Sequence, residues 1–358
     1  MAMARAVFAA VGAIDAARAA LTHGALVPLW RPLVSDLAVV LTLHRFADRD
    51  RGVAGTPVDL LRANLEFLRR HQFRIAALGD LLSDESSGPR RGGPHVVFTV
   101  DDGYAEFASV AAPVFAEFDC PVTVFMTTGP VDNGTWYWWD RVDYAIGKTT
   151  KPGLTLELGG RRMHWQWRSP GDRDVALASV NEALKLVSDE EKERALILIA
   201  DQLNVAIPSG PPPRFAAMSW DDVRRCAKTG VTFGPHSVTH PILPQVDAAR
   251  SDWEMRESWR RLQAECTATV PVFCYPNGAY SDREVNLLAA SEMKAAVTTF
   301  SRYAAVGAFQ SQLPTTRYAV PRFGYSGDPA QFMQIVTGLE RLKLALRRGR
   351  DGWRAVGA

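Results

Sequence analysis

The stretch Val96-Val97-Phe98-Thr99-Val100-Asp101-Asp102-Gly103 sets two neighbouring carboxylates directly after an apolar run. A run of β-branched and aromatic residues without a charge predicts a strand that is buried on both faces. Such a strand would deliver both carboxylates to one end of a sheet, where their negative charges repel each other. A bound metal ion is the simplest way to offset that repulsion.

Predicted strands and helices alternate on both sides of this run. Helices are expected over residues 57–71 and 107–118, and the other strands over residues 38–43, 73–78, 121–127, 231–234, 272–275, 295–299 and 319–323. This alternation is typical of a parallel α/β fold, either a barrel or a doubly wound sheet.

Residues 133–213 interrupt the alternation and predict an insertion. The segment opens with Trp136-Tyr137-Trp138-Trp139-Asp140, continues with a strand pair near 154–167, and closes with helices over 175–187 and 189–203. The α/β rhythm resumes at Ser219, which predicts a helix N-cap with Asp222 as its capping-box partner. We expect an N-terminal helical segment, an α/β domain with this insertion, and a basic C-terminal helix or tail, over residues 1–35, 36–335 and 336–358.

The composition is that of a soluble globular protein, with 358 residues, 47% hydrophobic and 22% charged. A formal net charge of +2 gives no global electrostatic reason to expect nucleic acid as a partner. The four cysteines form no CxxC pair, which favours buried thiols over a disulfide framework or a cysteine metal site.

Both chain ends predict amphipathic helices. Residues 1–34 are rich in Ala and Leu, but their uncharged runs are too short to span a bilayer and resemble a signal peptide only weakly. We expect this helix to pack on the domain or to touch a membrane surface. The basic stretch Arg341 to Arg354 could also touch a membrane surface. The default location is therefore cytoplasmic or peripheral to a membrane. The sequence does not indicate an oligomeric state.

A second cluster of ligand-type side chains is His236-Ser237-Val238-Thr239-His240, which also follows a predicted strand. Because the carboxyl ends of parallel strands gather at one face, an aspartate and both histidines would meet there. One carboxylate and two imidazoles suit zinc, with an open fourth position, and would also accept cobalt or iron. Taken singly, the aspartates could cap a helix and one histidine could fill the core.

The third segment, Phe273-Cys274-Tyr275-Pro276-Asn277-Gly278, again ends a predicted strand. Its Pro and Gly favour a tight turn, which could aim the backbone N–H of Asn277 at a developing oxyanion. The alternative is an ordinary β-turn.

In this order the three segments resemble the polysaccharide deacetylases, the NodB-homology or carbohydrate esterase family 4 group. Thr99-Val100-Asp101-Asp102-Gly103 is similar to that family's TFDDG motif, His236 to His240 to its HSxxH motif, and Tyr275 to Gly278 to its third motif. The resemblance covers roughly residues 36–335. It implies a distorted (β/α)7 barrel.

The resemblance also implies a role for each of these residues. Asp102, His236 and His240 would hold the divalent metal, with zinc favoured over cobalt or iron, and Asp101 would be the general base. The backbone N–H of Asn277 would share the oxyanion with the metal.

The chain departs from the family pattern around the base. Val100 replaces a Phe, and the arginine of the third motif is absent, with Cys274 near its place. Arg322, near the end of the predicted strand 319–323, could supply a guanidinium instead. The alternative is a surface or ion-pairing arginine.

The chain also departs from the family pattern at the general acid. The family's C-terminal LxH motif is missing, because no histidine follows His240. His44 follows the predicted strand 38–43, as in family members that look circularly permuted, so the resemblance makes His44 the acid. The alternative is a histidine in a turn after that strand.

The resemblance implies a metal-dependent hydrolase that removes the N-acetyl group of an amino sugar in a polysaccharide, glycolipid or related glycan. Alternatives are an O-acetyl esterase with the same site and a carbohydrate-binding module that has lost catalysis. The aromatic cluster Trp136 to Asp140 could stack on a sugar, or could pack in the core.

Overall fold

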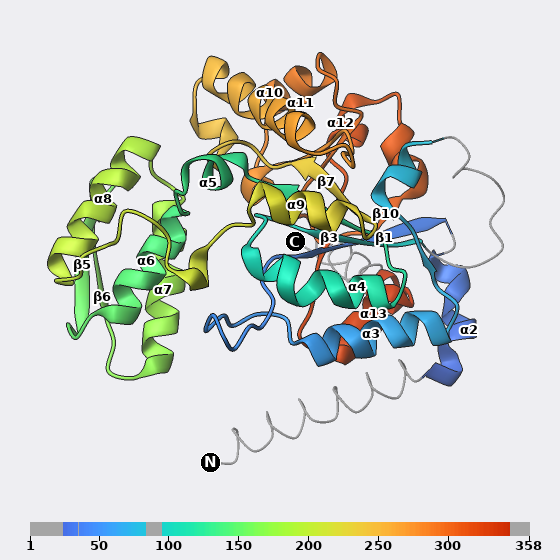
Figure 1. The fold of residues 1–358 in the computed structure, drawn as a ribbon, viewed down its shortest axis with the longest axis horizontal. Helices are drawn as coiled ribbons and strands as arrows, with labels where there is room; N and C mark the ends of the chain where they lie inside the picture. The colour runs from blue at the N-terminus through green and yellow to red at the C-terminus, as the bar shows by residue number, and fades with distance from the viewer. Residues whose placement is uncertain (1–23, 35, 84–94, 344–358) are drawn as a thin grey trace, which may run out of the picture.

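The computed structural model describes residues 24–34, 36–83 and 95–343. A mainly parallel sheet lies at its centre, with the strand order β10-β1-β3-β4-β7, and with β11 beside β1 and β2 beside β3 (Figure 1). The bounds of these strands are β1 Leu37–Leu43, β2 Arg74–Ile75, β3 His95–Val100, β4 Val122–Met126, β7 Val231–Pro235, β10 Ala304–Ala305 and β11 Phe323–Gly324.

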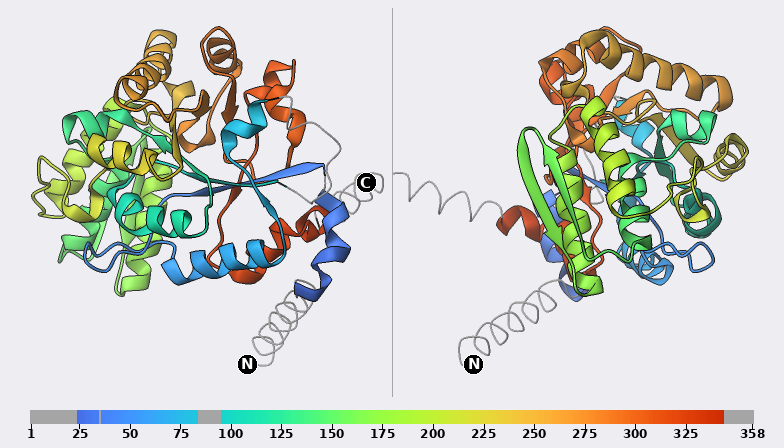
Figure 2. Two further views of the ribbon diagram at one scale, coloured as in Figure 1. Left: turned by 45° about the vertical axis from the view of Figure 1, so that its right-hand side comes forward. Right: turned by 90° about the vertical axis from the view of Figure 1, so that its left-hand side faces the viewer.

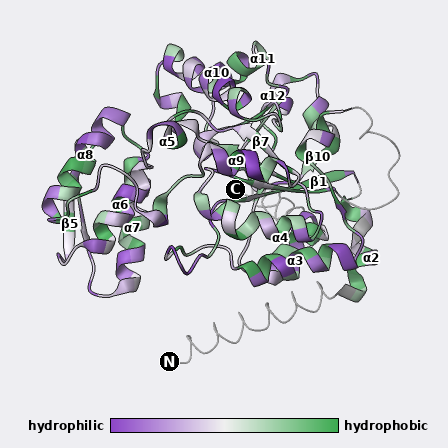
Figure 3. Ribbon diagram, viewed as in Figure 1, coloured by the Kyte–Doolittle hydropathy of each residue, from purple (hydrophilic) through white to green (hydrophobic). Residues whose placement is uncertain are grey.

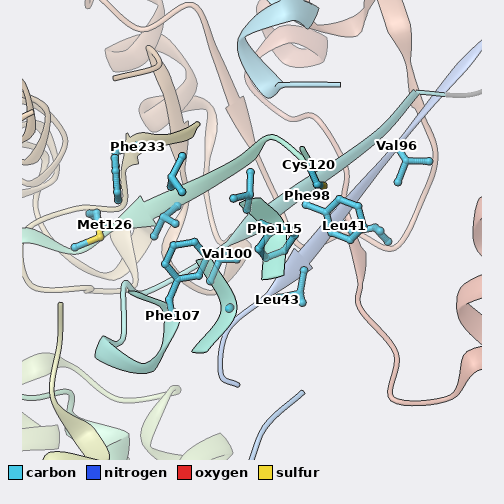
Figure 4. Close-up of a cluster of buried hydrophobic side chains, with 14 of the residues drawn as sticks. Leu41, Leu43, Val96, Phe98, Val100, Phe107, Phe115, Cys120, Met126 and Phe233 are labelled. Atoms are coloured by element: carbon cyan, nitrogen blue, oxygen red, sulfur yellow. The ribbon is translucent and has the colours of Figure 1, made fainter. Parts of the chain in front are cut away.

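The central strand β3 confirms the expectation of a strand buried on both faces. All six of its residues are buried, and it pairs in parallel with β1 and β4. Phe98 of β3 meets the ring of Phe115 edge-on at 5.5 Å, with Leu41 and Cys120 alongside (Figure 4). Burying each such side chain stabilises the fold by about 1.5–3 kcal/mol.

Helices cover both faces of the sheet. α3, α4 and α13 lie on one side, and α10 and α11 on the other (Figures 1 and 2). Hydrophobic and hydrophilic stretches alternate along α3 and α10, as expected of helices that bury one face (Figure 3). The helices outside the insertion are α2 Val27–Trp30, α3 Val58–Arg70, α4 Ala112–Glu117, α5 Thr128–Asn133, α9 Trp220–Ala227, α10 Ala248–Glu265, α11 Asp282–Ala289, α12 Pro314–Arg317 and α13 Pro329–Val336.

Several predicted elements differ in length or type. The helix expected over 107–118 begins with a π-helical turn, Phe107–Ala111, before α4. The strand expected over 73–78 shortens to β2, and of that expected over 319–323 only Phe323 lies in a strand, β11. α9 has the predicted capping box between Ser219 and Asp222.

The ladders do not show the predicted (β/α)7 barrel, although the α/β fold itself is present. β8 (Val272–Cys274) and β9 (Ala295–Val297) form a parallel pair outside the main sheet. Single bridges, Phe233 to Thr269 and Val297 to Val320, stand where a continuous barrel would need ladders on either side of this pair.

The insertion, residues 133–213, contains helices and a hairpin with their own apolar cluster. Val142, Leu156, Val180 and Leu196 are among its buried side chains. The hairpin and α7 stand at one end of the molecule (Figure 2). Its elements are α6 Trp138–Lys148, β5 Gly153–Leu158, β6 Arg161–Gln166, α7 Pro170–Leu184 and α8 Asp189–Gln202. The division into three parts stays a prediction.

The predicted terminal helices fall largely on residues 1–23 and 344–358, outside the described residues. Among the described residues, no helix combines the length and apolar character needed to cross a bilayer.

Candidate metal centre

A left-handed turn after β3 separates the two neighbouring aspartates. Asp102 has φ +71° and Gly103 has φ +74°. Glycine adopts this φ without strain, and a Cβ on Gly103 would lie 2.4 Å from Sδ of Met126, which would have to move. The carboxylate of Asp102 therefore faces residues 236–240, which we call the histidine loop, whereas that of Asp101 faces Arg322.

The histidine loop after β7 is fixed by hydrogen bonds from three sides. The backbone N–H of His236 donates to the carbonyl of Met126 at 2.9 Å, and that of Gly129 donates to the carbonyl of Val238 at 2.8 Å. Glu254 of α10 accepts from the backbone N–H groups of Val238 and Thr239, at 2.7 and 2.9 Å. The loop thus has little freedom to move its imidazoles.

Three buried side chains converge at this point. Nε2 of His236 and of His240 lie 3.5 and 3.6 Å from Oδ1 of Asp102. Ligands of a tetrahedral zinc ion, with bonds of about 2.0–2.1 Å, stand roughly 3.3–3.5 Å apart. The three side chains therefore fit the ligand set of a divalent metal ion.

The hydrogen bond of His236 agrees with this arrangement, whereas His240 has none at the corresponding nitrogen within the part of the chain that the structure describes. Nδ1 of His236 lies 2.7 Å from the carbonyl oxygen of Cys274, and because a carbonyl only accepts, Nδ1 carries the proton and Nε2 keeps a free lone pair. Nδ1 of His240 is buried with no hydrogen-bond partner among the described residues.

The electrostatics of the group centre on the buried Asp102 carboxylate, which stays ionised among the imidazoles around it. Burial raises the pKa of the Asp102 carboxyl, but His236, His44 and His240 lower it more. Burial lowers the pKa of His236, yet Cys274 and Asp102 raise it well above its ordinary value. Burial, followed by repulsion from His236, lowers the pKa of His240 to about 3.

A second possible ligand group, Asp101 with His236 and Cys274, fits a metal less well. Nη2 of Arg322 already lies 3.1 Å from Sγ of Cys274, so a cation occupies its edge. Burial also raises the pKa of the Cys274 thiol, which disfavours the thiolate that a metal requires.

Arg322 holds the other aspartate. Its guanidinium is completely buried and donates to both carboxylate oxygens of Asp101 at 2.7 Å, while Nε donates to the carbonyl of Thr298. Burial raises the pKa of Asp101, but Arg322 lowers it more, helped by His236 and His44, so the net pKa is well below the usual range. Arg322 stands directly before β11, and it is an ion-pairing residue in the interior rather than on the surface.

His44 and Asn277 line a cavity next to the two aspartates and the two histidines. Nε2 of His44 is 3.9 Å from Oδ2 of Asp101, and its side chain is 50% exposed. Asn277 has φ +54° in a tight turn after β8. A Cβ on the following Gly278 would lie 2.1 Å from Oγ1 of Thr299, so this turn also requires glycine.

The aromatic segment of the insertion packs against a histidine of the group. The ring of Trp139 stacks on Tyr137 at 4.3 Å and meets His240 edge-on at 4.7 Å. Tyr137 donates to the backbone carbonyl of Asp102, and Trp139 donates to the hydroxyl of Tyr104. Asp140 is buried beneath them and accepts from Tyr104, so of the cluster Trp136 to Asp140 only Trp138 and Trp139 line the cavity beside the histidines.

All the predicted site residues except Arg322, which lies behind Asp101, line one cavity of about 320 Å³. Sequence reasoning missed the part of its lining contributed by α7 and its C-cap, namely Ala178, Asn181 and Glu182 with Lys185. It also missed Glu254, which sits in the middle of α10 without a local motif. No local signal could reveal these residues, because their place depends on how distant elements pack.

Comparisons with known proteins agree with the resemblance drawn from the motifs. A family model described as polysaccharide deacetylase matches residues 178–296, which include both histidines of the group and the turn at Asn277. No curated protein matches the sequence.

The fold is similar to those of solved deacetylases. The deacetylase PplD of Streptococcus pyogenes, solved in complex with acetate, has a TM-score of 0.53 at 16% identity, over 84% of this chain and 98% of that chain. IcaB from Ammonifex degensii has a TM-score of 0.52 at 15% identity, over 85% and 98%. At such identities the likeness concerns the fold. Together, the matched region and the fold confirm the resemblance to the polysaccharide deacetylases.

Proposed function

We propose that this protein is a metal-dependent deacetylase that hydrolyses the N-acetyl group of an amino sugar in a glycan. The observation that carries the proposal is the separation of two adjacent carboxylates into two roles. Asp102 joins His236 and His240 as a ligand group, whereas Arg322 keeps Asp101 ionised and outside that group.

Each residue of the site has a separate role in the proposed hydrolysis. Asp101 takes a proton from the attacking water, and Arg322 fixes the orientation of its carboxylate. The turn at Asn277 presents a backbone N–H to the developing oxyanion. His44, at the open edge, protonates the leaving amine.

A divalent metal, zinc being the first choice, would supply Lewis acidity that lowers the pKa of water and polarises the acetyl carbonyl. Asp102, His236 and His240 would hold it, and a fourth position would stay open for the reaction.

We favour the amide over the ester because of His44. An amine is a poor leaving group unless it is protonated, whereas an alcohol leaves more easily. A half-exposed imidazole 3.9 Å from the base is suited to deliver that proton. A carbohydrate-binding module would not need an ionised Asp101 held in place by a buried Arg322.

The strand arrangement supports one further part of this proposal. Following the ladders and the two single bridges, the parallel strands trace a ring, which we propose is the distorted (β/α)7 barrel of the deacetylases. The ends of β1, β3, β7 and β8 would then surround the cavity, as at the carboxyl face of other barrels.

The test is release of acetate by the full chain after removal of metals and reconstitution with Zn²⁺, Co²⁺ or Fe²⁺. N-acetylglucosamine, its oligomers and O-acetylated sugars would serve as substrates. Metal-dependent release from the N-acetyl sugars is expected. Release from O-acetyl sugars alone would favour the esterase, and no release from either would overturn the proposal.

A further inference from the structure

One side of the cavity is built by the insertion and takes no part in the proposed hydrolysis. This insertion wall consists of Trp138 and Trp139 of α6, Ala178, Asn181 and Glu182 of α7, and Lys185, which caps the C-terminus of α7. α6 and α7 pack side by side (Figure 1). The wall is therefore a surface next to the metal centre that the proposed chemistry leaves unassigned.

Trp138 is held rigidly in this wall. Its ring is partly buried and packs against the apolar cluster of the insertion. Nζ of Lys192, a buried side chain paired with Asp189 at 2.9 Å, lies 5.2 Å from the ring centroid, and the ring of Trp139 stands perpendicular at 5.4 Å. A ring fixed in this way loses little freedom when a flat apolar surface packs on it.

Asn181 has hydrogen-bonding capacity that the protein does not use. Its Oδ1 is shielded from solvent and has no hydrogen-bond partner among the described residues, although the residue lines the cavity. An unpaired buried carbonyl costs free energy. Rotation of the amide about its last torsion would offer a donor or an acceptor to a ligand hydroxyl, which can complete either bond.

The charges of the insertion wall cancel. Glu182 and Lys185 form an ion pair at 2.7 Å. Among the described residues that line the cavity, Lys185 is the only lysine or arginine, so no free cation is offered to a phosphate or a uronate. The wall therefore suits a neutral ligand.

We propose that the insertion wall is a second sugar subsite for a neutral hexosamine chain. This inference rests on the proposed function. With the N-acetylated residue at the metal centre, the adjoining sugar packs its apolar face on Trp138, and one of its hydroxyl groups bonds to Asn181. The substrate is then an oligomer or polymer rather than a single sugar.

The experiment measures how the reaction depends on chain length. We would determine kcat/KM for N-acetylglucosamine and for its oligomers of two to five residues, with the full chain carrying its metal. In the unaltered protein, kcat/KM for the oligomers is expected to exceed that for the monomer by about tenfold or more. This ratio of oligomer to monomer kcat/KM should fall towards one in Trp138→Ala and, less completely, in Asn181→Ala. Trp138→Phe should recover part of the gain. Trp253→Ala, which removes an exposed tryptophan of α10 outside this cavity, should leave the ratio unchanged.

A binding measurement keeps the subsite separate from the hydrolysis. Calorimetric titration of Asp101→Asn with the same oligomers should show affinity rising with length, and adding Trp138→Ala should remove the rise. Turnover without dependence on length would overturn the subsite and leave the deacetylase intact. Length-dependent binding without acetate release from any substrate would overturn the deacetylase and leave the subsite intact. If the oligomers neither bind nor react, both proposals fail.

Discussion

Asp101 and Asp102 are neighbours in the chain, yet their carboxylates meet different partners. The left-handed conformation of Asp102, rare for a residue with a side chain, turns them apart. Ser237, His240 and Asn277 adopt positive φ as well. Strained conformations persist where surrounding contacts over-determine them, and these four lie in the turns that carry the residues of the cavity.

This division between the aspartates can be tested by exchanging one oxygen for nitrogen. Asp101→Asn removes the base but leaves Asp102, His236 and His240 in place. We expect acetate release to fall by about 10²- to 10⁴-fold, with metal content unchanged by elemental analysis. Asp102→Asn is the matched comparison and should lose metal. If Asp101→Asn lost the metal instead, the two roles would have to be exchanged.

His44 gives a second prediction at the residue scale. If it protonates the leaving amine, His44→Ala should slow amide hydrolysis by about 10²-fold or more, while an activated ester, whose leaving group needs no proton, should be much less affected. Rates on an N-acetyl sugar and on an aryl acetate would be compared in the same preparation. Equal losses on both would remove His44 from the role of acid.

At the scale of elements, the metal centre depends on a helix that supplies no ligand. Glu254 of α10 is completely buried and accepts from two backbone N–H groups of the histidine loop and from the hydroxyl of Thr239. Arg250, one turn earlier, donates to the same carboxylate. α10 therefore fixes the loop between His236 and His240.

We predict that Glu254→Ala weakens metal binding by about 10- to 100-fold, as loss of a partner behind the ligands does elsewhere. Competition with a chromophoric chelator would measure the affinity. Glu257→Ala is the control, because that carboxylate pairs with Arg260 at the surface of the same helix. Unchanged affinity in Glu254→Ala would mean that the other hydrogen bonds of the loop, such as those to Met126 and Gly129, hold it without Glu254.

The elements also show which parts could be predicted from the sequence and which could not. β3 and β7 are apolar runs followed at once by polar ligands, so periodicity predicts both the strands and the meeting of their ends. β2 and β11 are short because few of their residues find ladder partners, and no local pattern encodes that. Asn181 reaches the cavity, and Glu254 reaches the histidine loop, only through the packing of whole helices. Their residue types and spacing carry no sign of it.

At the scale of the whole molecule, the insertion meets the α/β core through buried polar groups. Asp140 of α6 accepts from the hydroxyl of Tyr104 at 2.8 Å, and Nη1 of Arg45 lies 4.0 Å away. Asp143 pairs with Arg214, whose backbone carbonyl accepts from Arg45. The orientation of Trp138 and Trp139 over the cavity depends on this junction, since both lie in the same helix as Asp140.

The junction predicts a pH dependence of stability. Burial raises the pKa of Asp140 to about 8, although Tyr104 and Arg45 oppose it and Asp102 adds to it. In the unfolded chain that pKa is about 3.9. Between these values the folded protein binds more protons than the unfolded one, so its stability falls as pH rises. The urea concentration at the midpoint of unfolding should therefore decline in the unaltered protein between about pH 5 and pH 8. It should decline less in Asp140→Asn. Asp201→Asn, at the surface of α8, is the control and should follow the unaltered protein. Equal slopes in all three proteins would show that Asp140 is already ionised at the junction.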